Sequence, residues 1–200
     1  MSFALILQRG GADGKTFFGC STGSPGSTTP LYGVSSGLYV VMGVSGSGKS
    51  LIGAALAGAL GLTFVEGDEY HPPGNVERMS RGVALTDGDR AGWLRALAAR
   101  IREADDSGEG LVLTCSALKR AYRDILRAES RSLRFVFLGG PRELIAERLA
   151  GRRGHFMPPS LLESQLAILE EPSPDEDAWV CDISRSPQDI VAALVARASA

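Results

Sequence analysis

The sequence predicts an α/β protein in which helices cover both faces of one parallel sheet. Short, almost uninterrupted apolar runs alternate along the chain with segments of helical periodicity. Strands that are buried on both faces read in this way, whereas half-exposed strands alternate apolar and polar residues. The 200 residues are 44% hydrophobic, which suffices for one core. We therefore expect a single three-layer domain.

Five apolar runs have the character of strands. They are 38–42, 62–66, 111–115, 133–138 and 179–183, and helices are expected over 51–60, 89–103, around 122–126, 141–151, 160–170 and from 186 onward. Three pairs have the spacing of helix N-caps, namely Thr86 with Asp89, Ser160 with Glu163, and Ser186 with Asp189. The expectation is a five-stranded parallel sheet.

Residues 1–37 differ in composition from the remainder of the chain. They are rich in Gly, Ser and Thr and lack the periodicity of a helix or a strand. Such segments cannot bury enough apolar surface to fold, which predicts a disordered leader at 1–37. A targeting peptide, a vector remnant and an over-extended start remain alternatives for it. The folded domain is expected to cover 38–200.

Charge and cysteine content limit the classes of partner. A net charge of -2 gives no general attraction to nucleic acid or acidic membranes, so we expect neither as a partner. The three cysteines cannot all pair, which favours the reducing cytoplasm. No apolar stretch approaches the roughly 20 residues of a membrane helix. The oligomeric state, a homodimer included, is left open.

The strongest motif lies between the first expected strand and the first expected helix. It matches GxxxxGK[ST] and consists of Gly43, Val44, Ser45, Gly46, Ser47, Gly48, Lys49 and Ser50. The glycines let successive backbone N–H groups point at phosphates, and the following helix adds its positive end. Lys49 would reach the β- and γ-phosphates, and the Ser50 hydroxyl would hold Mg²⁺. The sequence therefore predicts an ATP site.

Two carboxylates follow the second expected strand. Glu66 and Asp68 stand two residues apart, where an extended backbone would point both to the same side. Ligands of open α/β sheets bind at the carboxyl ends of strands. One carboxylate could hold the water shell of a metal while the other meets a substrate hydroxyl. A solvated acidic loop is the plainer alternative.

Basic residues gather after three of the expected strands. They are Arg78, Arg81 and Arg90, then Lys119, Arg120 and Arg123, and finally Arg148, Arg152 and Arg153. Together they could converge on anionic ligands, although any single one could be a solvated side chain. The segment 151–159 is rich in Gly, Arg and Pro and is expected to be a lid. His155 within it is a candidate phosphate or substrate donor.

Several blocks resemble gluconokinases of the small, thermoresistant P-loop type. They are Gly67-Asp68-Glu69-Tyr70-His71-Pro72, Leu85-Thr86-Asp87-Gly88-Asp89-Arg90, Cys115-Ser116-Ala117-Leu118-Lys119, and Gly154-His155-Phe156-Met157 followed by Gln165. The resemblance spans about residues 38–200. It implies a fold like that of shikimate and nucleoside-monophosphate kinases, with a lid. The implied reaction converts ATP and D-gluconate into ADP and 6-phosphogluconate.

The resemblance also implies roles for individual residues. Asp68 becomes the base on the gluconate 6-hydroxyl, Lys49 the cation of the phosphate loop, and Arg148 with Arg152 or Arg153 the lid cations. The turn containing Arg185 and Pro187 should border adenine. Glu66 stands where related kinases often have Asp, which favours a water-mediated contact with the metal. For the gluconate carboxylate we expect His71, Arg78 and Arg90, with Lys119 next.

Two rival functions share parts of this pattern. A shikimate-type or other sugar-acid kinase would differ only in the acceptor pocket. A nucleotide switch or motor ATPase would need an acidic residue at the end of an apolar strand, yet the run 111–115 leads into Ser116.

Overall fold

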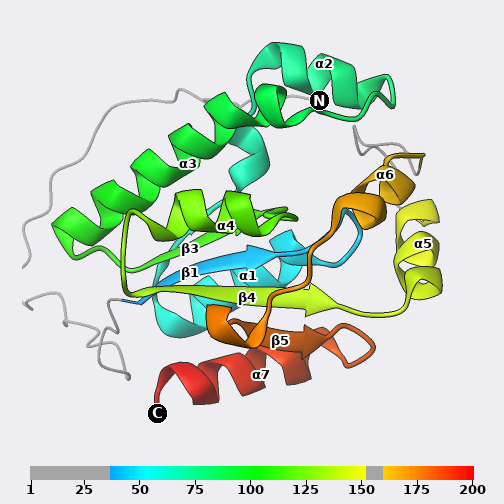
Figure 1. Cartoon of the computed structure of the whole chain (residues 1–200). Helices are drawn as coiled ribbons and strands as arrows, with labels where there is room; N and C mark the ends of the chain where they lie inside the picture. Colours follow the sequence, from blue (N-terminus) through cyan, green and yellow to red (C-terminus); the bar gives the residue numbers. More distant parts are fainter. Residues whose placement is uncertain (1–36, 152–159) are drawn as a thin grey trace, which may run out of the picture.

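The protein contains one five-stranded parallel sheet, as the sequence predicts (Figure 1). A computed structural model describes residues 37–151 and 160–200. The strands are β1 (Leu38–Met42), β2 (Thr63–Val65), β3 (Leu111–Cys115), β4 (Leu133–Gly139) and β5 (Trp179–Asp182). Their order is β2-β3-β1-β4-β5, so β1 lies at the centre.

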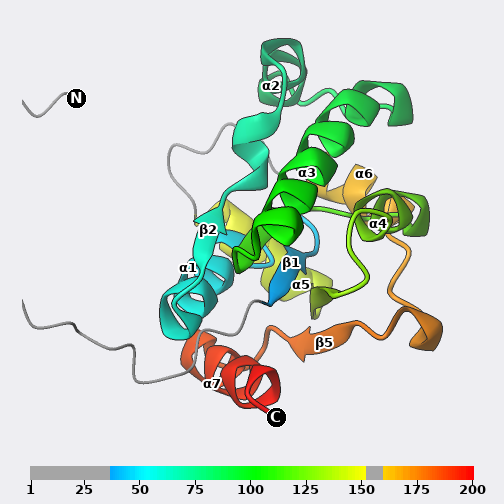
Figure 2. The same cartoon turned by 90° about the vertical axis from the view of Figure 1, so that its left-hand side faces the viewer.

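Helices lie on both faces of the sheet and at its carboxyl edge (Figures 1 and 2). α3 (Asp87–Ser107) and α4 (Arg120–Arg127) cover one face, and α1 (Lys49–Leu60) and α7 (Pro187–Ala198) cover the other. The remaining helices are α2 (Pro73–Ser80), α5 (Arg142–Ala150), α6 (Ser160–Ile168) and the 3₁₀ turns η1 (Gly67–Tyr70) and η2 (Pro174–Glu176). The expected three layers are confirmed.

The side chains of β1 alternate between two hydrophobic clusters. Val40 and Met42 pack with α3 and α4, whereas Tyr39 and Val41 pack with α1 and α7. Every residue of β1 is buried, because the central strand has helices above and below it. This double burial explains the uninterrupted apolar run in the sequence.

The structure refines the expected elements at several points. The capping box at Thr86 and Asp89 is confirmed, and so is the cap at Ser186. α3 runs from Asp87 to Ser107 and is longer than expected, whereas α2 was not expected at all. α2 has Pro at its start and few apolar residues, so its sequence gives only a weak helical signal. Most of the expected leader, residues 1–36, lies outside the described residues.

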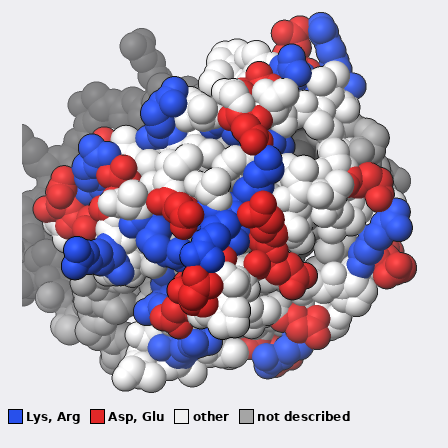
Figure 3. Space-filling view, viewed as in Figure 1, with Lys and Arg blue, Asp and Glu red and all other residues white. Residues whose placement is uncertain are grey.

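Charged residues on the face shown in Figure 3 are interspersed in sign. Exposed ion pairs such as Arg142–Glu163 and Arg120–Asp175 join neighbouring elements. Such pairs contribute little to stability individually. Within 37–151 and 160–200, no helix is long and apolar enough to cross a membrane.

One ion pair is fully buried and joins α4 to the segment before β5. Arg123 donates through Nη2 to Oε1 of Glu176 at 2.7 Å, and both side chains are 1% exposed. The guanidinium also donates to the carbonyl oxygens of Ala117 and Glu170, at 3.1 and 2.9 Å. Arg123 therefore fixes the loop that follows β3, and its role is structural.

We predict that Glu176→Gln lowers the free energy of unfolding by about 3–5 kcal/mol, because Arg123 would stay buried without a counter-charge. Urea denaturation measures this change. The exposed pair Arg81–Glu77 supplies a matched control, and Glu77→Gln should cost less than about 1 kcal/mol. Equal effects of the two substitutions would contradict the structural role.

The same pair predicts an acid dependence. The hydrogen bond from Arg123 lowers the pKa of Glu176 from 4.5 to about 2. The unfolded chain therefore binds the extra proton first, so this stabilisation is present above pH 4.5 and is lost as the pH falls toward about 2. The stability difference between the wild type and Glu176→Gln should shrink over that range.

Candidate active site

The phosphate-binding loop leaves the centre of the sheet, between β1 and α1. Gly43, Gly46 and Gly48 have φ of +142°, +86° and +99°, a region that side chains disfavour. A Cβ at Gly46 would also lie 2.7 Å from Cγ of Leu149 in α5. The loop thus needs its glycines both for its turns and for its packing. This loop leads directly into the N-terminus of α1, where the first backbone N–H groups of a helix favour an anion.

A cavity of about 410 Å³ opens beside this loop, between α1, α5 and the turn before α7. Gly46, Ser47 and Gly48 line it on one side, and Arg185 and Pro187 line it on the other. The Ser47 hydroxyl is buried and has no hydrogen-bond partner within the described ranges. A phosphate oxygen would satisfy it. The cavity therefore fits a nucleoside phosphate.

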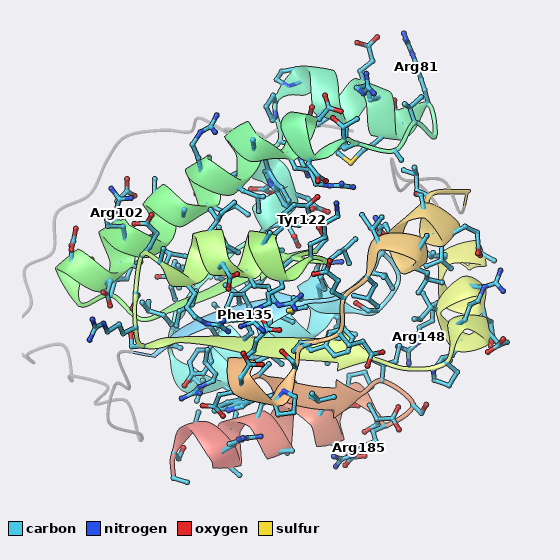
Figure 4. The ribbon with its side chains drawn as sticks, viewed as in Figure 1. Arg81, Arg102, Tyr122, Phe135, Arg148 and Arg185 are labelled. Carbon is cyan, nitrogen blue, oxygen red and sulfur yellow. The ribbon has the colours of Figure 1, made fainter. Side chains whose placement is uncertain are left out.

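Arg148 belongs to this cavity. Its guanidinium donates to the carbonyl oxygen of Ile183 at 2.8 Å, which holds it at the wall near Arg185 (Figure 4). Both arginines lie at the carboxyl edge of the sheet. Arg148 thus lies on the nucleotide side, and it does not line the acceptor pocket described below.

The acidic loop is held against the end of β3. The backbone N–H of Gly67 donates to Oγ1 of Thr114 at 3.0 Å, and the Thr114 hydroxyl donates to the carboxylate of Glu66. A Cβ on Gly67 would lie 1.9 Å from the Thr114 carbonyl oxygen. Only glycine permits this approach.

The expectation that Glu66 and Asp68 share one side of an extended backbone is wrong. The chain turns into η1 directly after Glu66, because Gly67 packs on β3. Glu66 is therefore held by Thr114, whereas Asp68 lines a separate pocket. The two carboxylates therefore lie at different places, one beside Thr114 and the other in the pocket lining.

A second, smaller pocket lies on the other side of the phosphate loop. We call it the acceptor pocket, and it is lined by Ser45, Lys49, Asp68, His71, Met79, Leu85, Arg90, Trp93, Ser116 and Gln165. Lys49 is half-buried, and its ammonium donates to the Val44 carbonyl oxygen at 3.1 Å. The pocket brings the cation of the phosphate loop and the carboxylate of Asp68 to one space.

His71 is stacked on Trp93 within this pocket. The ring centroids are 4.1 Å apart, and the Trp93 indole N–H donates to the Gly67 carbonyl oxygen at 2.7 Å. Burial lowers the pKa of His71, opposed by Asp68 and assisted by Arg90. Its Nδ1 is buried and has no partner among the residues described. Burial therefore favours the neutral imidazole, which could bond to a substrate hydroxyl.

Arg90 is the buried cation of the acceptor pocket. It is 8% exposed, and its Nη1 donates to the Tyr122 hydroxyl at 3.4 Å. Within 37–151 and 160–200 its nitrogens form no ion pair at 4.0 Å or less, although its charge contributes to the lowered pKa of Asp87 and of Asp89. An anionic ligand in the pocket would add a direct, charged hydrogen-bond partner for the guanidinium.

Lys119 and Arg78 lie outside the lining of this pocket. The ammonium of Lys119 donates to both carboxylate oxygens of Asp87, at 2.9 and 2.8 Å. This bond and that from Tyr122 lower the pKa of Asp87 (Tyr122 is labelled in Figure 4). Arg78 is half-exposed, 3.7 Å from Asp89. Both basic residues already have acidic partners.

The structure thus brings together Lys49, Asp68, His71 and Arg90 from the expected set. Arg152 and His155 lie outside the described residues. Five further lining residues were not expected as site residues, namely Met79, Leu85, Trp93, Ser116 and Gln165. Ser116 and Gln165 stand in blocks that carry the family resemblance, but their place in the pocket depends on tertiary packing.

Two oxygen donors suit a magnesium ion. Ser50 stands in the first turn of α1, next to Lys49, and Glu66 offers a carboxylate anchored by Thr114. No group of three or more His, Cys, Asp or Glu residues gathers in the part of the chain that the structure describes. Mg²⁺ in kinases takes few protein ligands and completes its shell with phosphates and water. Ser50 and Glu66 are therefore candidate protein ligands for such an ion.

We predict that Gly67→Ala displaces the acidic loop, because its methyl group cannot occupy the space of the Thr114 carbonyl. Overpacking of this kind costs about 1–3 kcal/mol, which thermal unfolding measures. Gly58→Ala provides the control, since a Cβ at that helical position meets nothing within 4 Å. Equal melting temperatures for wild type and Gly67→Ala would refute the close packing.

Comparisons with known proteins agree with this geometry. A family model described as an AAA domain matches residues 38–172. The chain is 49% identical to a gluconokinase of Gluconobacter oxydans (strain 621H), over 78% of this chain and 88% of that protein. A sugar kinase from Janibacter sp. HTCC2649 has a TM-score of 0.76 at 48% identity, covering 79% of this chain and 91% of the other.

A solved gluconokinase from Sinorhizobium meliloti 1021 is also 48% identical, with a TM-score of 0.73, and the match covers 82% of this chain and 93% of that one. Both matches cover most of the length of each relative. The chain therefore belongs to the gluconokinase family of P-loop proteins.

Proposed function

We propose that the protein transfers the γ-phosphoryl group of ATP to the 6-hydroxyl of D-gluconate. The observation that carries this proposal is the buried Arg90, unpaired with any carboxylate of the described chain, in a pocket that also holds Asp68 and Lys49. A polyol with a carboxylate at one end and a hydroxyl at the other matches these charges. The products are ADP and 6-phosphogluconate.

The nucleotide would occupy the cavity between α1, α5 and α7. Backbone N–H groups of 43–50 would bind the phosphates, with Arg148 as a nearby cation. Arg185 and Pro187 would border the adenine. Ser50 would hold Mg²⁺ directly and Glu66 through water, and the ion would neutralise phosphate charge. Arg152 and His155 complete the proposal as groups that close over the phosphates.

On the acceptor side, each group has a separate task. Arg90 binds the gluconate carboxylate, and the neutral His71 bonds to a hydroxyl along the chain. Asp68 accepts the proton that the 6-hydroxyl loses as its oxygen bonds to γ-phosphorus and the bond to ADP breaks. Lys49 balances the charge of the transferring group. Arg78 and Lys119 would stand at the edge of the pocket, where they pair with Asp89 and Asp87.

The proposal also places the protein in the cytoplasm. Burial raises the pKa of the Cys115 thiol to about 12, so this cysteine is an inert core residue. A buried thiol of this kind is compatible with the reducing cytoplasm.

Asp68→Asn tests the proton transfer. The amide keeps the shape of the side chain and removes its charge, so kcat should fall by about 10²- to 10⁴-fold while ATP affinity changes little. Steady-state kinetics with both substrates would measure this. If Asp68 only binds hydroxyls, the KM for gluconate will rise instead at nearly unchanged kcat. Changes below about twofold in both parameters would make Asp68 a bystander.

A panel of acceptors tests the substrate. The kcat/KM for D-gluconate should greatly exceed that for D-sorbitol, which has the same carbon chain without a carboxylate. It should also exceed that for shikimate, which has a rigid ring. Arg90→Gln should reduce the ratio of kcat/KM between gluconate and sorbitol by about 10-fold or more, because removing a charged partner costs about 1.5–3 kcal/mol. A preference for shikimate would favour the rival kinase. Rapid ATP hydrolysis without any acceptor would favour an ATPase.

A further inference from the structure

A buried glutamine joins the phosphate loop to the acceptor pocket. The backbone N–H of Ser45 donates to Oε1 of Gln165 at 2.7 Å, and Nε2 of Gln165 donates to the Ser45 hydroxyl at 3.1 Å. Both residues are buried, and both line the acceptor pocket with Lys49 and Asp68. The carboxamide thus binds one residue of the phosphate loop twice, across 120 positions of the sequence.

The chemistry of this contact suits a carboxamide. The Ser45 N–H needs an acceptor, and Gln165 Oε1 supplies it, which leaves the NH₂ group facing the hydroxyl. An apolar side chain at 165 would leave a buried N–H without this bond, at a cost in stability. A carboxylate could still accept, yet it would add negative charge beside the transferring phosphoryl group.

Gln165 comes from a helix that is fixed at other points of the same site. Leu161 of α6 packs with Met79 and Leu85, two further lining residues of the acceptor pocket. The N–H of Glu170, just after α6, donates to the Leu118 carbonyl oxygen at 2.8 Å. α6 therefore contacts the acceptor side through Leu161 and the phosphate loop through Gln165.

We propose that Gln165 is a positioning residue for phosphoryl transfer. By holding Ser45, it fixes the position of the phosphate loop relative to the acceptor pocket. The γ-phosphoryl group then lies in line with the gluconate 6-hydroxyl that hydrogen-bonds to Asp68. This inference rests on the proposed function. It assigns Gln165 no contact with the reacting atoms.

The direct test is Gln165→Met, which keeps the length of the side chain and removes both hydrogen bonds. kcat for gluconate should fall by about 10- to 100-fold, since small misplacements of reactants have effects of this order. The KM for gluconate should change less than threefold, because Arg90 and His71 are untouched. The ratio of ATP hydrolysed to gluconate phosphorylated should rise, which loss of folded protein alone would not cause.

Two further variants keep the test decisive if Gln165→Met folds poorly. Ser45→Ala removes one of the two bonds, so its fall in kcat should be smaller, and the double variant should be no slower than Gln165→Met alone. Gln165→Glu keeps the acceptor for the Ser45 N–H, and its charge should also lower kcat. Ser164→Ala is the matched control and should retain wild-type kinetics, because the Ser164 hydroxyl donates to the Leu161 carbonyl oxygen within α6.

The outcomes separate this inference from the proposed function. A wild-type enzyme that phosphorylates gluconate supports the function whatever the variants do. Wild-type kcat and coupling in Gln165→Met and Gln165→Glu would overturn the positioning role alone. Additive effects of Ser45→Ala and Gln165→Met would overturn it as well, because independent residues do not share one interaction.

Discussion

The central position of β1 in a parallel sheet determines where every part of the site lies. All five strands point their carboxyl ends to one edge, and the phosphate loop leaves that edge at its middle. The loops after β2 and β3 therefore lie on one side of it, and the turn after β5 lies on the other. Ligands of open α/β sheets bind at such an edge because the connections diverge there. The two pockets of this protein follow from that strand order.

Close packing then determines which side chains line the acceptor pocket at this edge. Gly67 packs closely against β3, and the loop that follows it carries Asp68 into the lining of the acceptor pocket. The stacked pair of His71 and Trp93 supports the same loop from α3. Arg90 contributes a buried positive charge from that helix. In the proposed function this charge would favour an anionic substrate, because a neutral analogue would lack a charged group to bind the guanidinium.

Much of the fold and the phosphate loop could be predicted from sequence, because those features are local. The apolar run of β1, the capping box at Thr86 and the glycines of 43–50 each carry their own signal. The path after Glu66 could not be predicted, since it depends on a contact with Thr114, which is distant in the sequence. Lys119 and Arg90 were both expected to bind the gluconate carboxylate, because both are basic residues near the carboxyl edge of the sheet. The pairing of Lys119 with Asp87 depends on tertiary packing. Tertiary contacts therefore decide which charged residues face the substrate.

The most direct test is a crystal structure of the protein with gluconate and a non-hydrolysable ATP analogue. We expect the phosphates along 43–50, the gluconate carboxylate on Arg90, and the 6-hydroxyl within hydrogen-bond distance of Asp68, about 2.6–3.2 Å. Gluconate bound away from Asp68, or with its carboxylate directed to solvent, would contradict the division of the site into two pockets.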